Sequence, residues 1–180
     1  MKTHLHILGA SGSGTTTIAR AAAVRLGYTH FDSDNYFWVP ASEPFTVQRE
    51  RAERVAMLEN DLDAHEKWIL SGSLADWGNA VIPYFDLVVF VTVTHDERME
   101  RLKKREYERY SDAVLPGGDR FEHSREFLEW AALYDDGGME VRSLMSHENW
   151  LKRVECPVLR IVNNVLSVSV EAVVNAAKTT

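Results

Sequence analysis

The sequence has few of the features that mark secreted or membrane-spanning proteins. It contains a single cysteine, Cys156, so no disulfide can form within the chain, and this suits a reducing compartment. Its longest apolar runs, such as residues 87–91, are far shorter than the roughly 20 residues of a membrane-spanning helix. The first residues, Met1 to His6, lack the apolar stretch of a signal peptide. We therefore expect a cytoplasmic protein with no membrane partner.

Basic residues are also scarce relative to acidic ones. The 20 Lys and Arg residues against 27 Asp and Glu residues give a formal net charge of −7, which argues against general binding of nucleic acid. Hydrophobic residues make up 45% of the chain and charged residues 26%, which excludes a disordered or fibrous protein. At about 150 residues per domain, we expect one domain over residues 1–180. The sequence does not distinguish a monomer from a homodimer.

Short apolar runs alternate with helical patterns along the chain. The expected strands are 5–8, 28–31, 68–70, 87–93 and 158–162. The expected helices are 14–26, 45–65, 94–109, 121–136, 141–154 and 168–177. A Thr94-x-x-Glu97 capping box is expected at the start of the third helix. Strands that alternate with helices predict βαβ units, and therefore an α/β fold with a parallel sheet that is covered on both faces.

The strongest motif is the segment GASGSGTTT, residues 9–17, which follows the first expected strand and opens the first helix. Gly9, Gly14 and Thr16 match the phosphate-loop template G-x-x-x-x-G-K-[ST], whereas Thr15 stands where lysine is expected. The backbone N–H groups of such a loop surround an anion at a helix N-terminus. We predict phosphate binding here, and the alternative is a turn that only caps the helix. The predicted nucleotide-binding residues of the loop are Gly9, Ser11, Gly12, Ser13, Gly14, Thr15, Thr16 and Thr17.

Acidic residues and a glycine follow the next two expected strands. Asp32 and Asp34 come after residues 28–31, and Gly72 comes after residues 68–70. Ligands of open α/β sheets bind beyond the carboxyl ends of the strands. Paired carboxylates beside a phosphate loop suit Mg²⁺, which takes one or two carboxylates together with phosphate oxygens and water. We predict that the two aspartates serve phosphoryl transfer, and the alternative is that they only form a turn.

A stripe of arginines lies on the expected helix 94–109. The stripe, spaced i, i+3, i+7 and i+11 along one helical face, consists of Arg98, Arg101, Arg105 and Arg109. Residues 97–109 hold six basic and four acidic residues, so this segment is locally +2 in a chain of −7. Because glutamates are interspersed, a salt-bridged and exposed helix face is an equally open interpretation.

Taken together, these motifs resemble those of the P-loop small-molecule kinases of the nucleoside-monophosphate kinase and shikimate kinase type. The resemblance covers nearly the whole chain in element order. It rests on residues 9–17, Phe31-Asp32-Ser33-Asp34, Ser71-Gly72-Ser73 and the helix segment 101–105. It implies a three-layer P-loop NTPase fold with a five-stranded parallel sheet, helices on both faces and a helical lid. The lid is expected at about residues 111–122.

The resemblance also implies roles for single residues. Thr16 and Asp32 would hold Mg²⁺, the latter through water, and Asp34 would orient or deprotonate the hydroxyl of an acceptor. Gly72 would border that acceptor. Asn163, which follows the last expected strand, would lie at the adenine of the nucleotide.

By the same resemblance, arginines serve both substrates. Arg49 and Arg54, after the second expected strand, would hold a carboxylate or phosphate of the acceptor, because a guanidinium group suits such bidentate contacts. Since the loop lacks its lysine, we expect Arg101, Arg105 or the lid residue Arg120 to supply the missing positive charge. The sequence does not tell which of the three does so.

Aromatic residues crowd the expected acceptor side. Tyr36, Phe37 and Trp38 follow the aspartates, and Trp77 follows Gly72. An aromatic or nucleoside-like acceptor could stack there. The alternative is that these rings fill the core or a lid.

The sequence as a whole predicts an ATP- and Mg²⁺-dependent kinase that phosphorylates a small molecule. The acceptor would be a nucleoside, a nucleotide or another hydroxyl-bearing metabolite, and its identity stays open. The main alternative is a nucleotide-binding regulatory module that transfers phosphate poorly, because the loop lacks its lysine. A third possibility is binding of another phosphorylated ligand without ATP.

Overall fold

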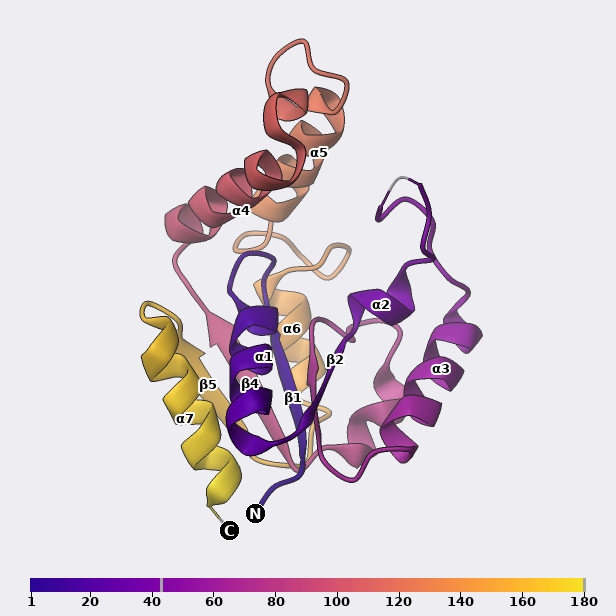
Figure 1. The fold of residues 1–180 in the computed structure, drawn as a ribbon, viewed down its shortest axis with the longest axis vertical. Helices are drawn as coiled ribbons and strands as arrows, with labels where there is room; N and C mark the ends of the chain where they lie inside the picture. The colour runs from indigo at the N-terminus through magenta and orange to yellow at the C-terminus, as the bar shows by residue number, and fades with distance from the viewer. Residues whose placement is uncertain (43, 180) are drawn as a thin grey trace.

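The computed structural model describes residues 1–42 and 44–179. Its elements are, in chain order, β1 (His4–Gly9), α1 (Thr15–Leu26), β2 (Thr29–Asp32), α2 (Asp34–Phe37), α3 (Arg51–Asp63), β3 (Trp68–Ser71), the 3-10 helix η1 (Asn79–Tyr84), β4 (Leu87–Thr92), α4 (His95–Tyr110), the 3-10 helix η2 (Ser111–Val114), α5 (Phe121–Ala132), α6 (Leu144–Leu151), β5 (Val158–Val162) and α7 (Leu166–Lys178). Figure 1 shows how they are arranged.

The strands form one five-stranded sheet in the order β2-β3-β1-β4-β5, and every neighbouring pair is parallel. Because parallel strands need crossover connections, helices lie on both faces. Helices α1 and α7 cover one face, while α3, η1 and α6 cover the other (Figure 1). The expected three-layer fold with a five-stranded parallel sheet is confirmed.

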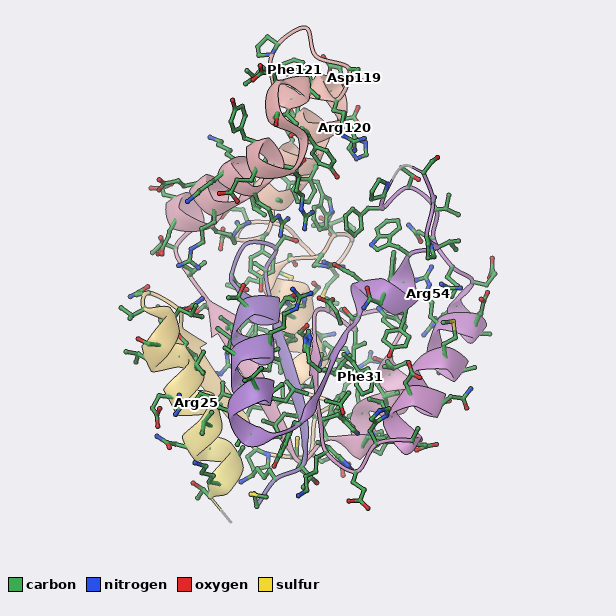
Figure 2. The ribbon with its side chains drawn as sticks, in the orientation of Figure 1. Arg25, Phe31, Arg54, Asp119, Arg120 and Phe121 are labelled. Carbon is green, nitrogen blue, oxygen red and sulfur yellow. The ribbon has the colours of Figure 1, made fainter. Side chains whose placement is uncertain are left out.

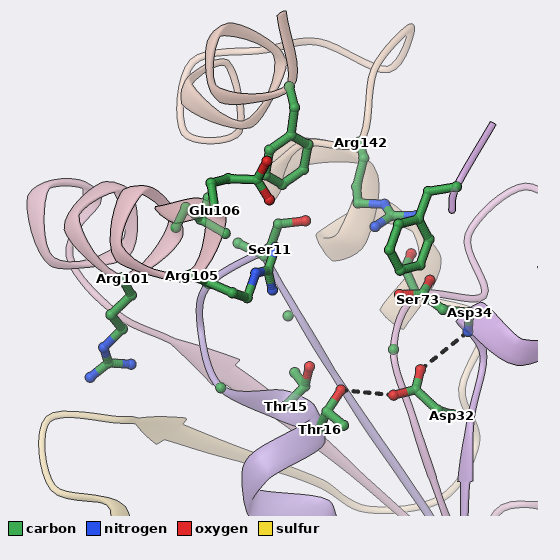
Figure 3. A pocket seen from close by; sticks show the side chains of 18 of the residues that line it. Ser11, Thr15, Thr16, Asp32, Asp34, Ser73, Arg101, Arg105, Glu106 and Arg142 are labelled. Carbon is green, nitrogen blue, oxygen red and sulfur yellow. Dashed lines mark hydrogen bonds between the residues drawn. The ribbon is translucent and has the colours of Figure 1, made fainter. Parts of the chain in front are cut away.

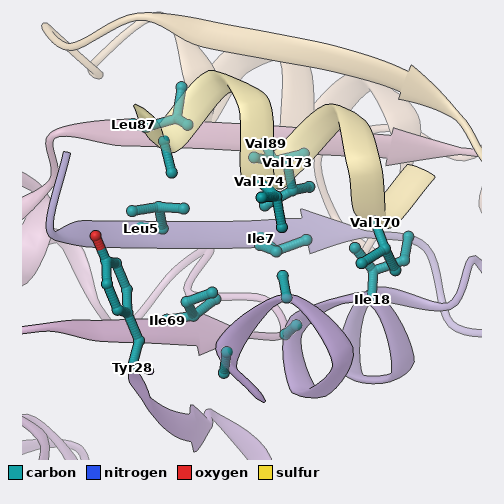
Figure 4. Packing of buried hydrophobic residues seen from close by; sticks show 14 of the residues in the cluster. Leu5, Ile7, Ile18, Tyr28, Ile69, Leu87, Val89, Val170, Val173 and Val174 are labelled. Atoms are coloured by element: carbon teal, nitrogen blue, oxygen red, sulfur yellow. The ribbon is translucent and has the colours of Figure 1, made fainter. Parts of the chain in front are cut away.

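The alternation of side chains along the strands builds two separate cores. Leu5 and Ile7 of β1 point to the side of α1 and α7, where the side chains of Val173 and Val174 meet them (Figure 4). Leu8 of the same strand packs in the other core. A strand that is buried on both faces must be apolar at consecutive positions, and this explains why short apolar runs located the strands well.

One helix is shorter than the sequence predicts. Residues 45–65 have helical spacing, but α3 begins only at Arg51. The preceding residues instead return toward α2, where Trp38 and Gln48 form an isolated antiparallel bridge. The Arg49 N–H donates to the Phe37 carbonyl at 2.9 Å. This backbone hydrogen bond joins residues that are distant in sequence and does not belong to a helix.

The prediction of a capping box at Thr94 is wrong, because the hydrogen bonds of its side chains do not form. Thr94 does occupy the N-cap of α4, but its side chain makes no capping hydrogen bond. Glu97 instead pairs with Arg101 along the helix. A capping box forms at α6, between Ser143 and Ser146.

The far end of α4, together with η2 and α5, projects beyond the sheet (Figure 1). The segment expected as a lid, residues 111–122, includes η2 and the turn at Gly117, whose φ of 90° suits glycine. Within the part of the chain that the structure describes, no helix is both long and apolar enough to cross a membrane.

Candidate active site

The loop between β1 and α1 has a backbone that only glycine tolerates at key positions. Gly12 and Gly14 have φ values of 85° and 93°, in the left-handed region. A Cβ on Gly14 would lie 2.6 Å from Nδ2 of Asn163, and a Cβ on Gly9 would lie 2.4 Å from the carbonyl oxygen of Val91. The loop is therefore built for close backbone approach, as a phosphate cradle at the N-terminus of α1 requires.

A cavity of about 860 Å³ opens beside this loop, at the carboxyl ends of the central strands and below α4 and α5 (Figure 3). It brings together most of the residues that the sequence singled out. Those that line it are Gly9, Ser11, Gly12, Gly14, Thr15, Thr16, Thr17, Asp32, Asp34, Gly72, Arg101, Arg105 and Asn163.

Ser13 and Arg120 lie outside this lining, as the described residues define it. Ser13 is fully buried under the loop, and its carbonyl accepts a hydrogen bond of 2.8 Å from Asn163. Arg120 lies in the projecting part of the molecule (Figure 2), with its guanidinium 4.1 Å from the centre of the Tyr110 ring. Arg120 thus lies at a distance from the loop.

Arg49 and Arg54 are also outside the lining. Arg49 donates to the carbonyl of Tyr36 at 3.1 Å and pairs with Glu53. Arg54 donates to the Arg49 carbonyl, and its guanidinium lies 3.9 Å from the centre of the Phe37 ring. Both side chains contact the segment between α2 and α3, and neither is among the described residues that line the cavity.

Two side chains, Thr16 and Asp32, and the backbone N–H of Asp34 link the loop to the end of β2. The hydroxyl of Thr16 donates to Oδ2 of Asp32 at 3.0 Å, and the Asp34 N–H donates to Oδ1 of the same carboxylate at 3.1 Å (Figure 3). Surrounding protein raises the pKa of Asp34, and the negative charge of Asp32 raises it further, while Arg142, Arg105 and Arg109 oppose the shift. A carboxylate with a raised pKa is a stronger base.

Thr16 and Asp32 also offer the oxygen ligands that Mg²⁺ prefers. Their hydroxyl and carboxylate oxygens are neighbours at 3.0 Å, directly after the phosphate loop. Mg²⁺ commonly takes one or two protein oxygens and completes its shell with phosphate oxygens and water. Among the described residues, no group of three or more His, Cys, Asp or Glu side chains could hold a metal ion.

The arginines of the α4 stripe have different partners. Arg98 is buried, donates to the Ala131 carbonyl at 2.7 Å and pairs with Asp135, so it joins α4 to the end of α5. Arg101 donates to the carbonyl of Asn163 at 2.9 Å and also pairs with a glutamate one turn earlier.

Arg105 faces the cavity with fewer partners. Its Nε is buried without a hydrogen-bond partner among the described residues. Burial lowers the pKa of Arg105, and the neighbouring Arg109 lowers it further, whereas Glu106 and Asp34 oppose this. Figure 3 shows its side chain extending from α4 over the loop that carries Ser11. Arg105 therefore brings to the cavity a guanidinium group whose Nε has no hydrogen-bond partner in the described part of the chain.

Asn163 supports the loop from the last strand. Its N–H donates to Thr92 at 2.8 Å, its side-chain NH₂ donates to the Ser13 carbonyl, and its Oδ1 accepts from Ser169 at 2.9 Å. The side chain thus holds the back of the phosphate loop against β5. The prediction that this position lies at an adenine stays a prediction.

Sequence reasoning missed a cationic residue that lines the cavity, Arg142. It lies in the connection between α5 and α6, outside every recognised motif, and lines the cavity near Asp34 and Ser73 (Figure 3). Burial lowers its pKa, and the charge of Asp34 opposes this most strongly. Within the described residues no carboxylate forms an ion pair with it, and its guanidinium lies 5.4 Å from the centre of the Trp130 ring. Nothing short of the tertiary structure places it here.

Comparison with known families gives two sequence matches. A family model described as an AAA domain matches residues 6–126. A protein of Bacillus subtilis (strain 168), described as "Uncharacterized protein YqaC", is 53% identical over 161 residues, which are 89% of each chain.

Solved structures with a similar fold include several kinases. Shikimate kinase from Bacteroides thetaiotaomicron matches with a TM-score of 0.59 at 18% identity, over 99% of this chain and 100% of that one. Shikimate kinase from Acinetobacter baumannii, in complex with shikimate, matches with a TM-score of 0.56 at 15% identity, over 99% and 96% of the two chains. A gluconokinase from Sinorhizobium meliloti 1021 matches with a TM-score of 0.52 at 17% identity, over 97% and 91%. At these identities the likeness concerns the fold.

Proposed function

Because the chain belongs to the AAA domain family and has the fold of P-loop small-molecule kinases, we propose that it transfers the γ-phosphoryl group of ATP to a hydroxyl of a small molecule. The observation that carries this proposal is the link Thr16–Asp32–Asp34. It joins a phosphate cradle to a base in a single cavity, and phosphoryl transfer needs these two parts beside each other.

The nucleotide would bind along the loop and the start of α1. Backbone N–H groups of residues 11–16 would cradle the phosphates, and Thr16 and Asp32 would hold Mg²⁺. When bound, this ion would neutralise part of the negative charge on the phosphates. The glycine backbone at Gly12 and Gly14 supports this proposal, because a Cβ at either position would collide with neighbouring residues.

Arg105 is our proposed substitute for the missing loop lysine. Among the three candidates, Arg101 is engaged by Glu97 and Asn163, and Arg120 lies outside the cavity lining. Arg105 lines the cavity and interacts electrostatically with Asp34, and no described residue forms a hydrogen bond with its Nε. A guanidinium at this place would stabilise negative charge on the transferred group.

On the acceptor side, Asp34 would take the proton from the acceptor hydroxyl. The hydroxyl oxygen forms a bond to the γ-phosphorus, the bond from that phosphorus to the β–γ bridging oxygen breaks, and ADP leaves with those electrons. Arg142 would hold an anionic group of the acceptor, because it lines this side of the cavity without a carboxylate partner in the described chain. Residues 111–122 would close over the site and exclude water.

The test is the fate of ATP in the presence of small metabolites. The purified protein is incubated with ATP, Mg²⁺ and a protein-free bacterial metabolite extract, and products are followed by mass spectrometry. We expect ADP together with a metabolite that is heavier by one phosphoryl group. Asp34→Asn should form neither. If ATP and Mg²⁺ bind but the extract causes no ADP formation, the regulatory module is the better account, and the absent lysine would explain the lack of turnover.

A further inference from the structure

Aromatic rings line the cavity from two segments that are distant in sequence. Trp38 and Phe45 come from the segment between α2 and α3, whereas Phe127 and Trp130 come from α5. Asp34 and Arg142 line the same cavity and lie on one side of it (Figure 3). The rings therefore line the cavity in which the acceptor of the proposed reaction would bind.

These rings are not part of either hydrophobic core. The nearby Tyr36 and Trp77 are buried, and they belong to the core between the sheet and α3. Phe45, by contrast, is 41% exposed, and Trp38, Phe127 and Trp130 are half-buried. A large aromatic surface that stays open in a cavity favours a ligand that removes it from water.

Three guanidinium groups lie beside these rings, on both segments of the lining. The guanidinium carbons of Arg142, Arg105 and Arg109 lie 5.4, 5.8 and 5.7 Å from the ring centres of Trp130, Phe127 and Phe45, in that order. Within the described residues, none of these arginines forms an ion pair with a carboxylate. Rings and cations thus alternate around the cavity, and this arrangement suits a flat ligand that carries negative charge at its edge.

We propose that the acceptor joins a planar aromatic ring to an anionic group, with the ring stacked between the two aromatic segments. This inference rests on the proposed function for the position of the reacting hydroxyl beside Asp34. Aromatic stacking supplies selectivity for the ring, and Arg142 supplies selectivity for the anion. The same chemistry is found in aromatic hydroxy acids and in nucleoside monophosphates, so the test includes both.

The experiment measures binding with matched probe pairs, in the presence of Mg²⁺ and a non-hydrolysable ATP analogue. One pair is 4-(hydroxymethyl)benzoate and its ring-saturated cyclohexane analogue. The other is a nucleoside 5′-monophosphate and ribose 5-phosphate, which lacks the base. The readout is the set of indole N–H signals in ¹H–¹⁵N spectra, because the chain has five tryptophans and two of them, Trp38 and Trp130, line the cavity.

We expect at least one aromatic probe to shift the signals of Trp38 and Trp130 while the signals of Trp68, Trp77 and Trp150 stay in place. The non-aromatic partner of that probe should bind at least tenfold more weakly. Trp130→Leu should weaken binding of the aromatic probe about fivefold, because it removes one of the stacked rings. Tyr107→Leu is the control, because Tyr107 is an exposed ring on α4 outside the cavity lining.

If neither aromatic probe moves the Trp38 and Trp130 signals at millimolar concentration, the inference is overturned. It is also overturned if the saturated probe binds as tightly as its aromatic partner. These outcomes differ from a failure of the proposed kinase activity. If only the proposed kinase activity fails, the aromatic probes still bind as expected, but no metabolite stimulates ADP formation.

Discussion

Asp34 is the residue on which the proposed chemistry depends most. Its carboxylate must be ionised to accept a proton, and its pKa is raised above the usual 3.8, first by burial and then by Asp32. As the pH falls through this raised pKa, the base becomes protonated, so kcat/KM should decline on the acid side at a higher pH than for an ordinary aspartate. A pH–rate profile with the acceptor measures this inflection.

Replacing the same carboxylate gives a second, independent result. Asp34→Asn should lower kcat by about 10²- to 10⁴-fold, which is the usual contribution of a positioned base. The affinity for ATP and Mg²⁺ should stay within twofold, because Thr16 and Asp32 are unchanged. Calorimetry on the variant separates the two effects. Undiminished turnover in Asp34→Asn would remove this residue from the mechanism.

Arg105 and Thr15 form a testable pair. If Arg105 supplies the charge of the missing lysine, Arg105→Ala should lower kcat/KM for ATP by about 10²-fold or more. Adding Thr15→Lys to this variant should restore much of the loss, because the new ammonium would reach the same phosphates. Steady-state kinetics of the single and double variants decide the matter. If the lysine rescues nothing, the proposed substitution of one cation by the other is wrong.

At the scale of elements, the phosphate loop is held by the helices and strands around it. A Cβ on Gly12 would lie 2.8 Å from the carbonyl oxygen of Arg98, so α4 packs directly on the loop. Gly14 is confined by Asn163, whose side chain is fixed by Ser13 and Ser169. The loop is therefore preformed, and this lowers the cost of ordering it around a ligand.

This packing predicts different results for two glycines with similar backbones. Gly14 and Gly27 both have left-handed φ values, 93° and 70°, so Gly→Ala should destabilise the protein by roughly 1 kcal/mol at either position. Nothing lies within 4 Å of a Cβ on Gly27, whereas Asn163 blocks one on Gly14. Only Gly14→Ala should weaken ATP binding, by tenfold or more, as calorimetry would measure. Equal affinities of Gly14→Ala and Gly27→Ala for ATP would contradict the proposal that the loop backbone cradles the phosphates.

Elements with strictly local signals were predictable from the sequence. The five strands were located to within about two residues, because their apolar runs reflect burial on both faces. The helix expected from residue 45 was wrong at its start, because Trp38 and Gln48 pair across the segment, and helical spacing carries no information on that contact. The 3-10 helix Asn79–Tyr84 and the short α2 carry no clear periodic signal either.

Some residues of the candidate site could be predicted from the sequence and others could not. Gly9, Asp32 and Gly72, which end a strand or directly follow one, could be placed because parallel strands end at one edge of the sheet. Arg142 and Trp130 could not, since their positions depend on how α5 returns over the cavity. The ion pair of Arg98 with Asp135 could not be predicted either, because the two residues are distant in sequence.

For the whole molecule, two buried histidines predict how stability depends on pH. Burial lowers the pKa of His6 and of His147 from 6.5 to about 3, so both are neutral when the protein is folded. The unfolded chain binds more protons between these values, and stability must therefore fall as the pH drops from 6.5 toward 3. Each histidine should cost about 2 kcal/mol at pH 5 relative to pH 7.

Urea unfolding at pH 7, 6 and 5 measures this loss. His123→Gln is the control, because His123 is exposed and its replacement should leave the pH dependence as it is. In NMR titrations, the ring signals of His6 and His147 should not move between pH 7 and pH 5. A free energy of unfolding that is the same at pH 7 and pH 5 would contradict the neutral, buried state of these rings.

The central claim is that the loop binds nucleotide without its lysine, and thermal unfolding with ATP, GTP and ADP, each with and without Mg²⁺, tests it most directly. At about 100 times its dissociation constant a ligand adds roughly 2.7 kcal/mol, or about 5 to 10 °C for a chain of this size. We predict such a shift with ATP that depends on Mg²⁺ and that Asp32→Asn loses. If no nucleotide shifts the transition with or without Mg²⁺, the loop with Thr15 does not bind nucleotide and the account is contradicted.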